Sequence, residues 1–107
     1  MIVMNFSEFQ EAALRTSQSD PHRERMMVQA LGLAGEAGEV GQLVKKWAWH
    51  GKPLDVEKMK DELSDVLWYV ADLASALHLN LDEVASHNVE KLRKRYPNGF
   101  TPDGGIR

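Results

Sequence analysis

Apolar residues recur at steps of three and four along most of the chain, and runs of alternating or β-branched residues are nearly absent. This period is that of amphipathic helices. It predicts helices over about residues 6–17, 23–47, 55–77 and 81–96. Helices joined by short connections pack antiparallel. We therefore expect an all-α fold, a four- to five-helix antiparallel bundle.

Capping residues mark where three of these helices begin. Ser7 followed by Gln10 matches a capping box for the first helix, and Asn5 is the alternative cap. Asp55 and Asn80 stand directly before the third and fourth helices, where their side chains can accept hydrogen bonds from free N–H groups. The helix boundaries therefore have local signals in addition to the apolar period.

The chain has 107 residues, which is the size of one domain. We expect a single domain over 1–107, with an N-terminal helix and linker over 1–22, core helices over 23–96 and an irregular tail over 97–107. No apolar run reaches about 18 residues and no signal peptide is evident, so no membrane partner is expected. The net charge of −3 gives no general attraction to nucleic acid. Because cysteine is absent, we expect a cytoplasmic location.

Four glycines interrupt the second predicted helix, at Gly32, Gly35, Gly38 and Gly41. Each destabilises a helix by about 1 kcal/mol relative to alanine. Their number indicates that something packs closely against this backbone, either a neighbouring helix or a ligand. A local kink is the simpler alternative.

Two pairs of acidic residues lie beside the apolar stripes of the second and third helices. Glu36 and Glu39 are three residues apart, and so are Glu62 and Asp65. Residues at this spacing share one side of a helix, with about 5–6 Å between their Cβ atoms. The short loop over about 48–54 makes the two helices antiparallel neighbours, so both pairs can meet across one cleft.

Four ionised carboxylates in one cleft repel each other unless some are protonated or a cation lies among them. The ligand atoms are all oxygen, which favours magnesium or manganese over zinc or copper. Magnesium held by carboxylates usually also binds substrate phosphates, which indicates phosphoryl or nucleotidyl hydrolysis. Acidic residues at this spacing are also common on solvated helix faces, so the pattern alone leaves both interpretations open.

The segments "GLAGEAGEVGQLVKK" and "KDELSDVLWYVADLA" resemble the MazG-like family of all-α nucleotide pyrophosphohydrolases. That family has an E-x-x-E pair followed by an E-x-x-D pair on the next helix, and four residues match these positions: Glu36, Glu39, Glu62 and Asp65. The segment "HNVEKLRKRYPNGF" is similar to the end of small members of the family. The resemblance covers about residues 27–100.

The resemblance implies a Mg²⁺-dependent nucleoside triphosphate pyrophosphohydrolase, with Mn²⁺ as the alternative ion. Such an enzyme releases a monophosphate and pyrophosphate. The resemblance also implies a house-cleaning role, which is the removal of noncanonical or surplus deoxynucleotides from the nucleotide pool. The four carboxylates would bind the metal, and Glu39, or else Glu36, would orient or deprotonate the attacking water. The alternative function is a non-catalytic helical binding or regulatory module that retains the metal site.

Further residues are candidates for binding the nucleotide. Tyr69 follows Asp65 by one turn, where it can contact the sugar or phosphate or belong to the core. Asn88, Lys91 and Arg95 share one face of the fourth helix. Lys91 and Arg95 can hold the triphosphate and Asn88 the sugar or base, although a basic helix end also interacts favourably with the helix dipole.

Aromatic residues follow the first acidic pair, at Trp47, Trp49 and His50. Aromatic faces stack on nucleobases, so these residues are candidates for binding the base. Packing in a core or interface is the alternative, and we favour it for Trp47. Asp72, one turn after Tyr69, is expected to be a solvated helix residue.

Apolar residues cover much of the circumference of the third predicted helix between Leu67 and Leu77. A small bundle covers only one side of such a helix, and exposed apolar patches mark interfaces. We therefore expect a homodimer or homotetramer in which third helices pack near each other. The active site would then draw on both chains, through the basic end of the fourth helix or the Trp47–His50 segment.

Overall fold

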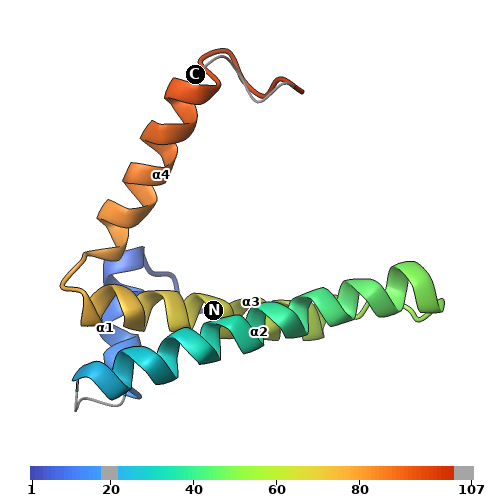
Figure 1. Cartoon of the computed structure of the whole chain (residues 1–107), viewed down its shortest axis with the longest axis horizontal. Coiled ribbons are helices and arrows are strands. Elements are labelled where there is room, and N and C mark those ends of the chain that lie inside the picture. Colours follow the sequence, from blue (N-terminus) through green and yellow to red (C-terminus); the bar gives the residue numbers. More distant parts are fainter. Residues whose placement is uncertain (18–21, 103–107) are drawn as a thin grey trace.

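Four helices make up the chain in a computed structural model that describes residues 1–17 and 22–102 (Figure 1). They are α1 (Phe6–Leu14), α2 (His22–His50), α3 (Val56–Ala76) and α4 (Leu81–Arg95). The described residues form no β-strand, so the predicted all-α fold is confirmed. None of the described helices is both long and apolar enough to cross a membrane.

Helices α2 and α3 form a long antiparallel hairpin (Figure 1). α2 runs to His50, three residues beyond its predicted end, and stops where Gly51 adopts a left-handed φ of +67°. Glycine takes this conformation without the steric cost of a Cβ. Asp55 caps α3 as predicted, because its side chain accepts a hydrogen bond from the N–H of Lys58 at 3.0 Å.

α1 begins with a capping box, although not the predicted one. The side chain of Asn5 accepts from the N–H of Glu8 at 2.8 Å, and the carboxylate of Glu8 accepts from the N–H of Asn5 at 3.0 Å. The predicted box of Ser7 and Gln10 is wrong because both side chains bond to distant residues instead. The hydroxyl of Ser7 bonds to the carboxylate of Asp82 in the first turn of α4.

Gln10 joins α1 to the turn between α3 and α4. Its buried amide donates to the hydroxyl of Ser75 at 3.0 Å and to the carbonyl oxygen of Leu79 at 2.8 Å. Its side-chain oxygen accepts from the N–H of Leu81, the first residue of α4, at 2.8 Å. α1 therefore holds the start of α4 in place.

α1 ends at Leu14, three residues earlier than predicted. The N–H groups of residues 15–17 bond to carbonyls three residues back, which is the tighter 3₁₀ pattern that closes many helices. This turn lets the hydroxyl of Thr16 accept from the indole N–H of Trp68 at 2.9 Å. A small core lies beside it, where Ala13, Ala71 and Leu81 are buried, with Phe9, Trp68 and Val70 packed around them.

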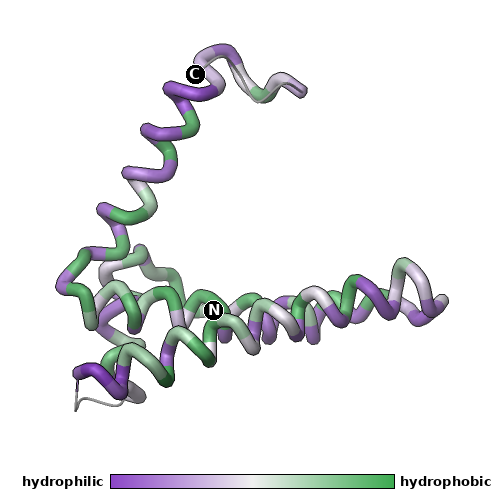
Figure 2. Tube along the Cα trace, in the orientation of Figure 1, coloured by the Kyte–Doolittle hydropathy of each residue, from purple (hydrophilic) through white to green (hydrophobic). Residues whose placement is uncertain are grey.

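Most of α4 stands apart from the hairpin (Figure 1). The turn before it holds His78 at φ +57°, and among the described residues α4 contacts α1 and α3 but not α2. Apolar and polar residues alternate along α4 (Figure 2), and its apolar Val84, Val89 and Leu92 are exposed. The predicted antiparallel packing is therefore seen between α2 and α3, while most of α4 lies outside it.

The apolar circumference of α3 is partly covered within the chain, because α2 and α1 both pack against it. Ala71, Ala74 and Ala76 are buried, although Leu77 is exposed. The large exposed apolar residues of the helices lie mainly on α2 and α4, at Met27, Val28, Leu31, Val44, Trp47, Trp49, Val84, Val89 and Leu92. These residues add a second apolar surface for a partner, and the predicted contact between third helices stays a prediction.

Candidate metal centre

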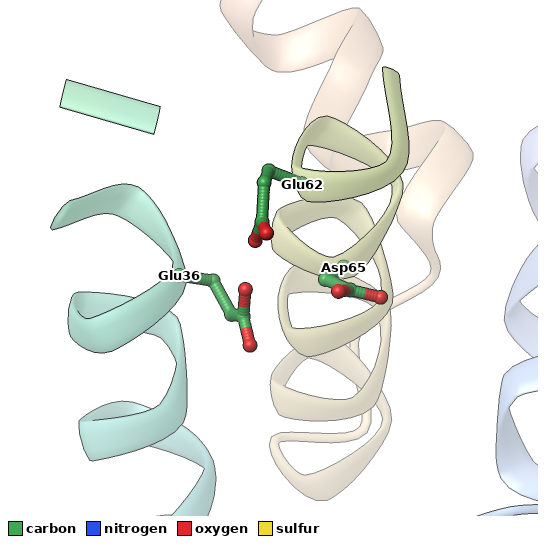
Figure 3. A group of neighbouring side chains, drawn as sticks. All are labelled: Glu36, Glu62 and Asp65. Atoms are coloured by element: carbon green, nitrogen blue, oxygen red, sulfur yellow. The ribbon is translucent and has the colours of Figure 1, made fainter. Parts of the chain in front are cut away.

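Three carboxylates meet between the two helices of the hairpin (Figure 3). Glu36 projects from α2, and Glu62 and Asp65 project from α3. One oxygen from each of the three lies within 4.8 Å of the other two, and all three side chains are half-buried. The spacing of three residues puts Glu62 and Asp65 on one side of α3, and the hairpin brings Glu36 opposite them.

The neighbouring carboxyl groups raise the pKa of Glu36. The hydrogen bond between Glu36 and Glu62, followed by burial and the negative charges of Glu62, Asp65 and Glu39, raises the pKa of Glu36 from 4.5 to about 7. Near neutral pH the group therefore favours either a bound proton or a bound cation.

The donor set fits a hard divalent cation. Its three ligand groups are carboxylates on two helices, close enough for one ion to bridge them. Oxygen-only ligands suit Mg²⁺ and Mn²⁺, which complete their coordination with water or substrate phosphate. The arrangement can therefore hold an ion and leave positions open for a ligand.

Glu39, the fourth predicted ligand, lies one turn beyond Glu36 on α2 and is exposed. Its negative charge contributes to the raised pKa of Glu36, so it lies within electrostatic reach of the group. It is not among the three residues whose oxygens meet within 4.8 Å. The structure thus brings three of the four predicted carboxylates together and leaves the fourth at the margin.

Tyr69 packs in the α2–α3 interface next to the carboxylates. A Cβ added to Gly32 would lie 2.3 Å from Cε1 of Tyr69, so the ring occupies the space that a larger residue at position 32 would need. The rings of Trp68 and Tyr69 meet edge to face, with centroids 5.0 Å apart. The predicted close approach of a neighbouring helix is therefore confirmed at Gly32. A Cβ at the other three glycines of α2 would meet nothing within 4 Å.

The predicted phosphate-binding and sugar-binding residues lie on α4. Asn88 and Lys91 are exposed, and the guanidinium of Arg95 lies 5.2 Å from the ring centroid of Tyr96. α4 makes no contact with α2 in the described part of the chain. A single chain therefore does not bring these three residues to Glu36.

The predicted base-binding residues lie in the last turn of α2, at the end of the hairpin that is far from α4 (Figure 1). Trp47 and Trp49 are 52% and 79% exposed, and His50 is the last residue of α2. Trp47 follows Glu36 by eleven residues, which is about 16 Å along a helix axis. Trp47 is not a core residue of the single chain, since half of its side chain is exposed, and its packing in an interface stays a prediction.

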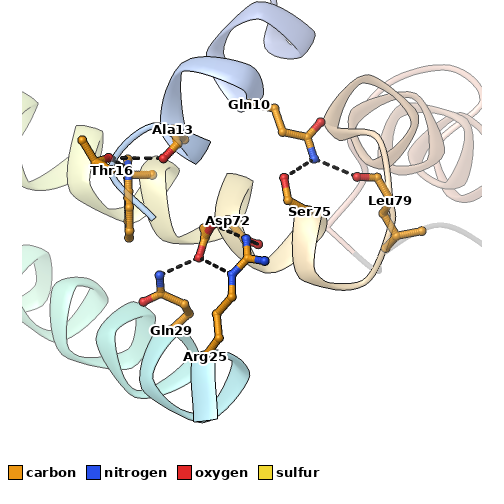
Figure 4. A network of polar contacts seen from close by, with 9 residues as sticks. Gln10, Ala13, Thr16, Arg25, Gln29, Asp72, Ser75 and Leu79 are labelled. Atoms are coloured by element: carbon orange, nitrogen blue, oxygen red, sulfur yellow. Dashed lines mark hydrogen bonds and ion pairs between the residues drawn. The ribbon is translucent and has the colours of Figure 1, made fainter. Parts of the chain in front are cut away.

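Asp72 is fully buried, and the prediction that it is solvated is wrong (Figure 4). Arg25 donates to its carboxylate at 2.5 and 3.3 Å, and Gln29 donates at 2.5 Å. Burial by itself raises the pKa of Asp72, but hydrogen bonds from Arg25, Ser17 and Gln29 and the charge of Arg25 outweigh it and lower this pKa below 3.8.

The sequence carries a signal for this network that the predictions above do not use. Asp72 follows Tyr69 by three residues and Asp65 by seven, so it continues the same stripe of α3. On α2, Gln29 precedes Gly32 by three residues and Arg25 precedes Gln29 by four. Aligning the two stripes in antiparallel register would have placed the acid opposite its partners.

Comparison with known proteins identifies the family. The family model of the MazG nucleotide pyrophosphohydrolase domain matches residues 26–100, which include all four carboxylates and every predicted substrate-binding residue. The chain belongs to the MazG nucleotide pyrophosphohydrolase family. The resemblance inferred from the two acidic pairs is confirmed.

Individual proteins are similar to this chain over most of its length. The Gene 37 protein of Mycobacterium phage L5 is 38% identical over 79 residues, which cover 70% of this chain and 69% of the phage protein. Proteins named dCTP pyrophosphatase 1 from Rattus norvegicus and Mus musculus are 33% and 31% identical over 85 residues. These matches cover 71% of this chain and 47% of each mammalian protein. No solved structure matches the chain significantly.

Proposed function

We propose that this MazG family member is a divalent-metal-dependent nucleoside triphosphate pyrophosphohydrolase. The observation that carries the proposal is the meeting of Glu36, Glu62 and Asp65, one carboxylate from α2 and two from α3, within 4.8 Å. The raised pKa of Glu36 supports it, since the hydrogen bond with Glu62, burial and the nearby negative charges make the group favour a bound proton or a bound cation. Membership of a nucleotide pyrophosphohydrolase family supplies the reaction class.

The ion is Mg²⁺, with Mn²⁺ as the alternative, and Glu36, Glu62 and Asp65 would hold it. When bound, the ion would neutralise phosphate charge and lower the pKa of the attacking water. Glu39 lies exposed one turn beyond Glu36, where its carboxylate can join the ligands or accept the proton of that water. Water attacks the α-phosphorus, the bond to the oxygen bridging to the β-phosphorus breaks, and a monophosphate and pyrophosphate leave.

The substrate is a nucleoside triphosphate, and the mammalian relatives named dCTP pyrophosphatase 1 favour a deoxynucleotide. The exposed rings of Trp47 and Trp49, together with His50, provide surfaces for stacking on a base. Tyr69 follows Asp65 by one helical turn, and its side chain contacts the sugar or the phosphate of the substrate. Such an activity serves house-cleaning of the cytoplasmic nucleotide pool.

The active form is a homodimer or homotetramer in which a second copy completes the site. α4 carries exposed apolar residues and four basic side chains near its end, at Lys91, Arg93, Lys94 and Arg95. The hairpin carries exposed apolar residues and the acidic group. These surfaces are complementary in charge, so α4 of one protomer can pack along the hairpin of its partner. Lys91 and Arg95 would then hold phosphate, with Asn88 beside the sugar or base.

Pyrophosphate release from a panel of ribonucleotides and deoxynucleotides, with and without Mg²⁺, tests the proposal. We expect Mg²⁺-dependent release from at least one triphosphate, and little from the E62Q variant. The matched control is E57Q, which changes an exposed glutamate on the same helix that pairs with Lys60 at 3.0 Å. A folded protein that binds nucleotide without releasing pyrophosphate would instead support the non-catalytic module.

A further inference from the structure

The contacts along the seam between α2 and α3 all belong to one antiparallel register. Three of them join Glu36 with Asp65, Gly32 with Tyr69, and Gln29 with Asp72. From one contact to the next, the position on α2 moves back by four and then three residues, and the position on α3 moves forward by four and then three residues. This is the pattern of two antiparallel helices in a constant register. The carboxylates at one end of the seam and the buried polar network at the other therefore require the same register of α2 against α3.

The carboxylate end of the seam cannot set this register by itself. Glu36 and Glu62 share a hydrogen bond across the seam, but the oxygens of Glu36, Glu62 and Asp65 lie within 4.8 Å of one another, so their charges favour separation of the two helices once all three are ionised. The neighbouring turns hold half-buried apolar side chains, whose contacts are not directional, while a Cβ added at Gly35 or Gly38 would meet nothing within 4 Å and Leu63 is 52% exposed. Apart from the short loop over residues 51–55, the directional contacts that place Glu36 opposite Glu62 and Asp65 must therefore lie elsewhere along the hairpin.

The network around Asp72 consists of contacts that can form in only one register of α2 against α3 (Figure 4). Asp72 on α3 is fully buried, and its partners Arg25 and Gln29 on α2 are nearly so. Hydrogen bonds are directional, whereas apolar contacts tolerate sliding. Sliding the helices by one turn would leave a buried charge without its partners, which is strongly unfavourable. Buried polar groups are best attested in proteins as devices that specify one register.

We propose that Asp72, together with Arg25 and Gln29, is a positioning group that fixes the register of α2 against α3 and thereby holds Glu36 opposite Glu62 and Asp65. The inference rests on the proposed metal-binding function of these three carboxylates. Its physical path is the seam itself, through the contact of Tyr69 with Gly32.

The main test replaces the network with apolar residues, in an R25M/Q29L/D72L variant. Apolar replacement of a buried ionic group is commonly neutral or stabilising, so folding and register can be separated. We expect a helical, cooperatively melting protein whose dissociation constant for Mn²⁺, measured by electron paramagnetic resonance, rises about 10–100-fold.

A second readout needs no metal. The chain contains no cysteine, so spin labels can be placed at E24C on α2 and K58C on α3, both exposed positions. In the observed register these positions are about 28 Å apart along the hairpin, and sliding by one turn changes this by about 5 Å. We expect one narrow distance in the parent chain and a broadened or shifted distribution in the triple variant.

The matched control is Q10L, which removes a buried amide that joins α1 to the turn before α4 and lies off the seam. We expect Q10L to lower the melting temperature while leaving both the Mn²⁺ affinity and the label distance unchanged. A milder variant, Q29M, keeps the ion pair of Arg25 with Asp72 and removes only one donor. We expect it to fold and to broaden the label distance.

A folded triple variant with parental Mn²⁺ affinity and label distance would overturn the proposal and leave the network a purely stabilising role. If the triple variant does not fold, an unchanged label distance in Q29M would overturn it. Absence of Mn²⁺ binding by the parent chain would instead contradict the proposed function, and the label distances would still decide whether Asp72 sets the register.

Discussion

The two ends of the α2–α3 seam hold buried or half-buried acids in opposite electrostatic situations. Asp72 lies against Arg25 and Gln29, and these partners lower its pKa despite complete burial. Two turns away, Glu36 lies against Glu62 and Asp65, and its pKa rises to about 7. An acid paired within the chain contributes to stability, whereas clustered acids favour the binding of a proton or a cation from solution.

The largest effect expected from this difference is on activity. Changing Glu36, Glu62 or Asp65 to its amide should reduce Mg²⁺-dependent pyrophosphate release on the order of 100-fold, because each change removes a metal ligand. The same changes should leave the metal-free protein as stable as the parent chain or more so, since they remove repulsion. Thermal melts in chelator, run beside the activity assay, separate the two effects. Parental turnover by E62Q would contradict the site assignment.

Asp72 should behave in the opposite way. An Asp72→Ala change leaves the guanidinium of Arg25 without its partner, and breaking a buried pair from one side destabilises by about 3–5 kcal/mol. Urea denaturation of the metal-free protein measures this directly. A loss below about 1 kcal/mol, the value of a surface pair, would show that the two ends of the seam do not differ as described.

Added metal should stabilise the end where acids repel. Binding to the folded state alone raises the free energy of unfolding by about 2.7 kcal/mol at a metal concentration of 100 times the dissociation constant. Thermal melts of the parent chain at increasing Mg²⁺ should therefore show a rising midpoint, and E36Q should show a smaller rise. Equal shifts in both proteins would place the ion elsewhere.

The smallest expected effect is a pH dependence of opposite sign at the two ends. Since the pKa of Glu36 is raised from 4.5 to about 7, its contribution to stability is complete below 4.5 and is lost as pH rises through about 7. Asp72 has a lowered pKa, so its contribution is present above 3.8 and is lost as pH falls below that value.

Melts of the metal-free protein should therefore show a midpoint that falls between about pH 5 and pH 8 in the parent chain and falls less in E36Q. Because both proteins keep Asp72, the difference between their two curves isolates Glu36. Parallel curves would mean that the repulsion around Glu36 is not present in solution.

Local signals in the sequence were sufficient for the four helices, apart from some of their ends, and for the three carboxylates of the candidate metal centre. Glu62 and Asp65 share a helix face by spacing alone, and the short loop after α2 brings Glu36 opposite. The cap at Asp55 also follows from local chemistry, because its side chain needs only the N–H groups of the next turn.

Features that depend on distant contacts could not be predicted in this way. The early end of α1 follows from a turn that brings Thr16 to Trp68, and the direction of α4 follows from His78 and the bonds of Gln10. Asp72 looked solvated because one helix considered alone does not show what its neighbour supplies. Residues on α4 and at the end of α2 remain apart in one chain, so their predicted roles depend on a second copy.

Isothermal titration of the parent chain with Mg²⁺ near pH 6.5, in two buffers of different ionisation enthalpy, tests the central claim most directly. Metal binding displaces protons from its ligands, and the pKa of about 7 leaves Glu36 largely protonated at this pH. We predict binding that releases part of a proton per chain, and weaker binding with less proton release in E36Q. Absence of binding, or binding with the same proton release in both proteins, would contradict a metal centre built on Glu36, Glu62 and Asp65.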